Sequence, residues 1–148
     1  GFHPFAFKAT NLAIHAACGL LVFLLALRLF TVAWPVSSRR RVVICSGLMA
    51  AQWLLHPLQL TPVLHVVQRM TSLSAFFMLA ALLLHIMARE RGGHAGWVSL
   101  LLAWGVLWPL SFFSKETGVL FPLFALAWEL IVRRSTQPIM EGMGAYDS

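Results

Sequence analysis

Five apolar runs, separated by short polar connectors, dominate this sequence of 148 residues. A helix that crosses a bilayer needs about 20 mostly apolar residues. The chain is 59% hydrophobic and only 11% charged, whereas soluble domains carry about 25% charged residues. A soluble fold of this size could not bury so much apolar surface. The pattern therefore predicts an all-α fold, a polytopic transmembrane helix bundle of about five spans.

The expected spans cover residues 9–34, 42–55, 70–88, 97–113 and 119–132. Pro35 follows the first span, and Pro109 is expected to kink the fourth. Residues 1–134 are therefore assigned to one transmembrane helical bundle, and residues 135–148 to a polar tail. Because the chain opens with Gly1 and shows no basic leader, we expect it to be an internal fragment of a larger membrane domain.

Arginines gather in alternate connectors. Arg-rich clusters lie at 39–41, 89–91 and 133–134, whereas the connectors around 56–69 and 114–118 are poor in net positive charge. The positive-inside rule places Arg-rich connectors on the cytoplasmic side. Five spans then alternate without conflict, with the N-terminus and the two other connectors on the non-cytoplasmic face. Topology thus explains the net charge of +6, and the expected partners are membrane lipids, with no nucleic acid.

Ionisable groups on the non-cytoplasmic face are the candidates for chemistry, because charge is costly near lipid. Arg69 precedes a long apolar run and could hold phosphate oxygens bidentately. The alternative is an arginine that snorkels to the headgroups. Lys115 and Glu116 form a charged pair in a tight break between two spans, where they could bind phosphate and orient a hydroxyl. The alternative there is a short solvated loop.

Other polar and aromatic side chains have simpler explanations. Glu129 is expected to pair with Arg133, four residues later on the same helix. Arg28 and His85 are expected at the cytoplasmic interface, and most tryptophans near span ends, where aromatic belts form. His56 lies in a His-Pro turn, but no histidine and carboxylate stand at a familiar ligand spacing. No metal site is therefore expected.

Three short motifs follow one another along the chain. They are Asn-Leu-Ala-Ile-His at 11–15, His56-Pro57 with Thr61-Pro62-Val63 and Gln68-Arg69, and Ser-Lys-Glu-Thr-Gly at 114–118 with Pro122 and Glu129. Their order and spacing resemble the polytopic glycosyltransferases of the C superfamily. The likeness is greatest to the membrane part of the transmembrane O-mannosyltransferases with tetratricopeptide repeats and their bacterial relatives. It extends from Asn11 to Glu129.

The resemblance implies transfer of a sugar, with mannose as a candidate, from a polyprenyl-phosphate donor to a protein or glycan acceptor. The reaction would take place on the non-cytoplasmic face of the membrane. In bacteria this is the non-cytoplasmic face of the inner membrane. A carboxylate would deprotonate the acceptor while basic groups hold the departing lipid phosphate. Arg69 and Lys115 map to the phosphate-binding groups, Glu116 to a polar partner, and His56 to a group that shapes the site.

The resemblance also implies that one part is missing. The catalytic carboxylate of these enzymes precedes the Asn-x-x-x-His helix, so we expect it upstream of Gly1 and no catalytic residue within this chain. This chain alone should therefore be inactive, and it should need no cofactor besides the sugar donor. The alternative is a non-catalytic transporter or scaffold subunit. Such a protein would scatter polar groups through its spans, whereas here they gather at one face.

Overall fold

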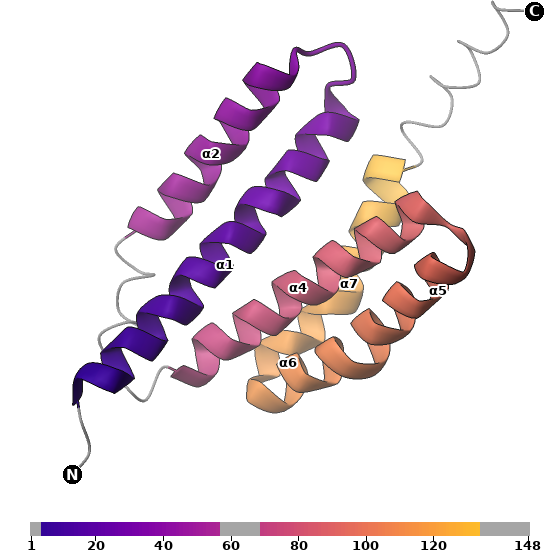
Figure 1. The fold of residues 1–148 in the computed structure, drawn as a ribbon. Helices are drawn as coiled ribbons and strands as arrows, with labels where there is room; N and C mark the ends of the chain where they lie inside the picture. Colours follow the sequence, from indigo (N-terminus) through magenta and orange to yellow (C-terminus); the bar gives the residue numbers. More distant parts are fainter. Residues whose placement is uncertain (1–3, 57–68, 134–148) are drawn as a thin grey trace, which may run out of the picture.

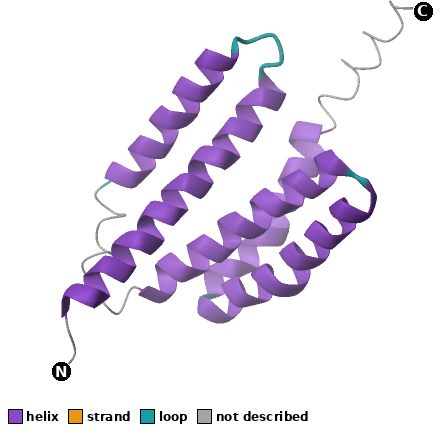
Figure 2. Ribbon diagram, viewed as in Figure 1, coloured by secondary structure: helices purple, strands orange, loops and turns teal. Residues whose placement is uncertain are grey.

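The computed structural model describes residues 4–56 and 69–133. All regular structure in these ranges is helical (Figure 2). The elements are α1 (Pro4–Ala33), α2 (Arg39–Leu55), α4 (Arg69–Arg91), α5 (Gly93–Leu102), the π-helical turn η2 (Ala103–Leu107), α6 (Trp108–Ser114), the 3-10 turn η3 (Glu116–Leu120), α7 (Phe121–Ala127) and the π-helical η4 (Trp128–Arg133). The predicted all-α fold is confirmed.

Consecutive elements join into rods that match the expected spans to within a few residues. In the described ranges, Lys8–Ala33, Met70–Arg91 and Gly93–Ser114 are long and apolar enough to cross a membrane. The helix α2 has 17 residues and packs along α1, and the last rod runs from η3 through α7 to η4. The chain is therefore a polytopic transmembrane helix bundle. Its tail, residues 135–148, lies outside the described ranges.

The helix α4 is the centre of the bundle. It packs against α1 on one side and against α5, α6 and α7 on the other, while α2 lies along α1 (Figure 1). One core cluster joins α1, α4 and η4 through Leu25, Leu83, Ile86 and Trp128. A second is built around Phe121 with Ala81, Ala103 and Ala125. Small alanines let helix backbones approach closely, which is how helices associate in lipid.

The fourth rod stays helical through Pro109, but its hydrogen bonding changes one turn earlier. The backbone N–H of Trp108 donates to the Ala103 carbonyl, five residues back, in the manner of a π-helix. Pro109 has no N–H with which to reach Gly105. The irregularity expected at the proline is therefore a π-helical turn at Ala103–Leu107 that precedes it.

The Arg-rich segments form helix ends. Arg39–Arg41 make up the first turn of α2, and Arg89 and Arg91 lie in the last turn of α4. The chain then enters α5 through Gly92 and Gly93, whose φ angles of 63° and 60° are accessible to glycine without steric cost. An ion pair of 2.7 Å between Arg28 and Glu90 joins the last part of α1 to the last turn of α4. The same end of the bundle therefore carries both clusters (Figure 1).

Candidate functional site

The first motif lies on the buried face of α1. Asn11 and His15 are 5% and 7% exposed. The imidazole of His15 stacks on Trp53, and its Nε2 lies 3.2 Å from the carbonyl oxygen of Leu54. Because that oxygen can only accept, Nε2 carries the proton in this contact. Carbonyls at the end of a helix lack an intrahelical partner, so His15 satisfies one of them and fixes the end of α2 to α1.

The second motif is described only at its ends. His56 caps α2 in an extended conformation, its side chain is exposed, and its N–H donates to the Trp53 carbonyl over 3.4 Å. Residues 57–68 lie outside the described ranges. Arg69 is the first residue of α4, and its side chain also lies outside the described part.

The third motif reaches the start of α4. Lys115 breaks the helix with an extended backbone, φ −165° and ψ 149°, between α6 and η3. Its Nζ donates to Oγ1 of Thr71 over 2.9 Å. Since Thr71 lies in the first turn of the helix that Arg69 begins, the fold brings this loop to the place where the second motif ends. Glu116, also exposed, is the first residue of η3.

Two buried serines, one in α4 and one in α6, form hydrogen bonds next to the turn between α6 and η3. Ser74 Oγ donates to the Ser111 carbonyl over 3.0 Å, and Ser111 Oγ donates to the Ser74 carbonyl over 2.9 Å. Ser74 Oγ also lies 3.4 Å from Oγ1 of Thr117. Such hydrogen bonds between helices are typical of membrane bundles. Sequence reasoning missed both serines, although small polar residues within apolar runs are a usable signal.

Close backbone packing fixes the second half of the same loop. The indole Nε1 of Trp108 donates to the Gly118 carbonyl over 3.1 Å. A Cβ on Gly118 would stand 2.5 Å from the backbone nitrogen of Phe112. Only glycine leaves room for this approach, so the conformation of the loop depends on Gly118.

Except for Glu129, which pairs with Arg89 in the last turn of α4, the described parts of the three motifs lie at one end of the bundle. They are the first half of α1, the end of α2, the start of α4 and the turn between α6 and η3 (Figure 1). This end is opposite the Arg-rich end. Among the described residues, no group of three or more His, Cys, Asp or Glu could hold a metal ion.

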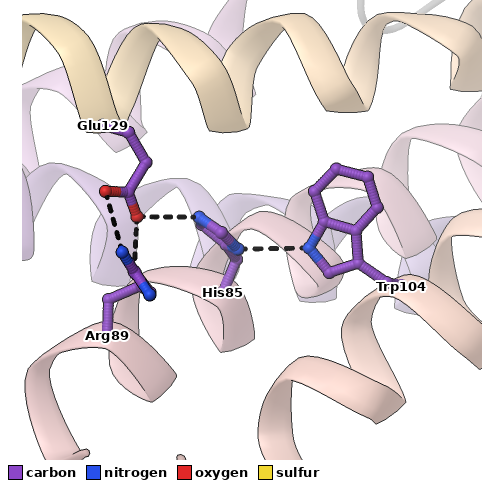
Figure 3. A network of polar contacts seen from close by, with 4 residues as sticks. All are labelled: His85, Arg89, Trp104 and Glu129. Atoms are coloured by element: carbon purple, nitrogen blue, oxygen red, sulfur yellow. Dashed lines mark hydrogen bonds and ion pairs between the residues drawn. The ribbon is translucent and has the colours of Figure 1, made fainter. Parts of the chain in front are cut away.

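A second polar group lies inside the bundle, toward the Arg-rich end (Figure 3). Trp104 Nε1 donates to Nδ1 of His85 over 3.2 Å, so the proton of a neutral imidazole is on Nε2. That Nε2 lies 3.5 Å from Oε1 of Glu129, an ion-pair distance without hydrogen-bond geometry. Arg89 Nε donates to the same oxygen over 2.6 Å. Glu129 therefore pairs across to α4, a partnership that spacing along its own helix did not predict.

The structure adds detail to two placements expected from the sequence. His85 is 6% exposed and packs between helices, toward the Arg-rich end, and its expected position at the cytoplasmic interface stays a prediction. Trp104, which is 36% exposed, and Trp108 pack against Phe121, with ring centroids 4.9 and 6.4 Å away. Trp34 and Trp97, in contrast, are 49% and 69% exposed near helix ends, as expected of an aromatic belt.

The fold defines the class of the protein as a polytopic α-helical membrane protein. Comparison of the chain with protein-family models, curated proteins and solved structures found no match. Any assignment of function therefore depends on the described side chains and on the motifs that carry them.

Proposed function

We propose that this chain is the membrane part of a glycosyltransferase that moves a sugar from a polyprenyl phosphate to a protein or glycan acceptor. One observation carries the proposal. The hydrogen bond of 2.9 Å from Lys115 to Thr71 joins the Ser-Lys-Glu-Thr-Gly loop to the turn that Arg69 begins. Two cationic residues, 46 positions apart in the sequence, thus belong to adjoining pieces of backbone.

The charge of Lys115 is available to a ligand. Its described partner, Thr71, is a neutral hydroxyl, and no described carboxylate forms an ion pair with it. An ammonium has three donors, so two remain for phosphate oxygens. Each charge-assisted hydrogen bond contributes about 1.5–3 kcal/mol.

The same cations would favour the reaction over mere binding. As the sugar leaves, negative charge grows on the lipid phosphate, and preorganised cations stabilise that charge most strongly in the transition state. Glu116, beside Lys115, would orient the acceptor hydroxyl, and His56 at the end of α2 would bound the site. In this proposal the general base is not among the described residues, and the site faces away from the cytoplasm of a bacterial inner membrane.

The test uses the protein as it occurs in its native membranes, with labelled polyprenyl-phosphate mannose. We expect Lys115→Ala to lose most of the transfer rate and Arg69→Lys to lose much of it, because lysine lacks the planar fork of arginine. Lys8→Ala removes an exposed lysine from the same end of the bundle and should keep the wild-type rate. Rates are divided by the amount of inserted protein. Wild-type rates for both site variants would refute the assignment.

A transporter or scaffold subunit is the second candidate, and the group formed by His85, Arg89 and Glu129 favours it. These ionisable side chains lie within the spans, where polar groups often line a path. The two functions are separable by experiment. A transporter would lose flux in Glu129→Gln and keep it in Lys115→Ala, whereas the transferase should respond in the opposite way.

A further inference from the structure

A groove of about 480 Å³ lies at the Arg-rich end, between α1, the first turns of α2 and the end of α4. Its lining changes character along its length. Leu24, Leu27 and Val43 supply apolar surface. The charged groups are Arg39 in the first turn of α2, Glu90 near the end of α4, and Arg28, five residues before the end of α1. From Leu24 to the end of α1 at Ala33 the helix rises by about 13 Å. Leu24, Leu27, Val32 and Val43 line this length together with Arg28 and Thr31, so the groove as a whole is long enough for a short segment of acyl chain.

The positive charge at this groove exceeds what the described acidic residues neutralise. Glu90 pairs with Arg28, and Glu129 pairs with Arg89. Glu116 lies at the opposite end of the bundle, at the start of η3. The three consecutive arginines of α2, Arg39–Arg41, are all exposed, and no ion pair with a described carboxylate involves them.

We propose that this groove binds one anionic phospholipid, with its phosphate at Arg39, next to the exposed Arg40 and Arg41, and an acyl chain along Leu24, Leu27 and Val43. Guanidinium groups bind phosphate bidentately, and basic pockets between transmembrane helices bind anionic headgroups. Charge complementarity identifies the occupant, because an apolar helix would cover the leucines and leave the arginines without an anion. The proposal is independent of the transfer reaction at the other end of the bundle.

The bound lipid would hold α2 in place. This helix packs on α1, and several of its apolar side chains are exposed, among them Ile44 and Leu48 at 50% and 66%. Arg39 of α2 and Glu90 of α4 line the same groove. A lipid seated there would therefore contact α1, α2 and α4 together.

The experiment measures lipid binding by native mass spectrometry of the purified protein released from micelles. Phosphatidylglycerol and phosphatidylcholine with identical acyl chains are compared. We expect one phosphatidylglycerol to be retained in preference to phosphatidylcholine. Arg39→Gln should weaken its binding about fivefold, since a basic residue near anionic lipid contributes about 1 kcal/mol. Val43→Trp, which fills the apolar part, should weaken both lipids.

Lys8→Gln is the matched control, because it removes one exposed positive charge at the opposite end of the bundle. It should leave phosphatidylglycerol binding unchanged. Equal retention of the two lipids, or equal loss in Lys8→Gln and Arg39→Gln, would overturn the proposal. In the last experiment, inorganic phosphate at millimolar concentration is added as a competitor of the bound phosphatidylglycerol. If it displaced the lipid completely, the site would be one for free phosphate and the acyl chain would play no part.

Discussion

Glu129 illustrates how single residues place charge inside this bundle. Its side chain is 26% exposed, and two groups of α4 contact it from the same direction (Figure 3). Arg89 uses two nitrogens, with distances of 2.6 and 3.2 Å to the two carboxylate oxygens, which is the fork geometry of a strong ion pair. Charges within membrane bundles face the interior and pair with one another. Glu129 thus holds the last rod against α4.

Replacing this carboxylate should loosen the last rod. We expect Glu129→Gln to lower the unfolding free energy in mixed micelles by about 1–3 kcal/mol, because the two hydrogen bonds from Arg89 lose a charged acceptor. Glu90→Gln is the matched control. It breaks a single hydrogen bond from Arg28, whereas Glu129 accepts two from Arg89, and it should cost less than about 1 kcal/mol. Equal losses in the two variants would contradict a special role for Glu129.

At the scale of elements, hydropathy predicted the helices well, because an apolar run of this length in lipid has few alternatives to a helix. The partners between helices could not be predicted in this way. Spacing along one helix indicates neighbours three or four residues apart, whereas Arg89 and Glu129 are 40 residues apart, and Ser74 and Ser111 are 37. The π-helical turn at Ala103–Leu107 likewise left no clear mark beyond the proline after it.

The candidate site was predictable only in outline. Alternating arginine clusters indicated that the motif loops share one face, which fits the end of the bundle where Lys115 contacts Thr71. That contact itself required the packing of α6 on α4, held by the buried serines. The relation of Arg69 to Lys115 within a single pocket stays a prediction, because the side chain of Arg69 and residues 57–68 lie outside the described part.

The turn between α6 and η3 offers a test at this scale. Gly118→Ala places a Cβ within 2.7 Å of three backbone atoms of Ser111 and Phe112. Backbone cannot give way as a flexible side chain can, so we expect a loss of about 1–3 kcal/mol in unfolding free energy. The matched control is Gly105→Ala, where nothing lies within 4 Å of the new atom. It should be neutral or stabilising by up to about 1 kcal/mol, since alanine favours helix. The same chemical change would then have opposite effects at two glycines.

The two ends of the whole molecule differ in chemistry. One end carries the arginines of α2 and α4 together with the Arg28–Glu90 pair. The other carries His56, Lys115 and Glu116. Each rod begins at one end and finishes at the other (Figure 1), so the ends alternate along the chain as the arginine clusters do. A membrane placed across the bundle would therefore separate the two kinds of surface.

This separation predicts how the chain is oriented. Because the positive-inside rule retains arginine-rich ends in the cytoplasm, Ser38 should face the cytoplasm and Ser114 the opposite side. The natural cysteines, Cys18 and Cys45, are first changed to alanine. Ser38→Cys and Ser114→Cys are then treated, one variant at a time, with a membrane-impermeant maleimide. In intact cells only Ser114→Cys should react. After permeabilisation both variants should react. The labelling of Ser114→Cys in intact cells is divided by its labelling after permeabilisation, because Ser114 is partly buried and reacts less than a fully exposed cysteine would. Labelling of both variants to the same extent in intact cells, or of Ser38→Cys alone, would show that the arginine clusters do not set the orientation.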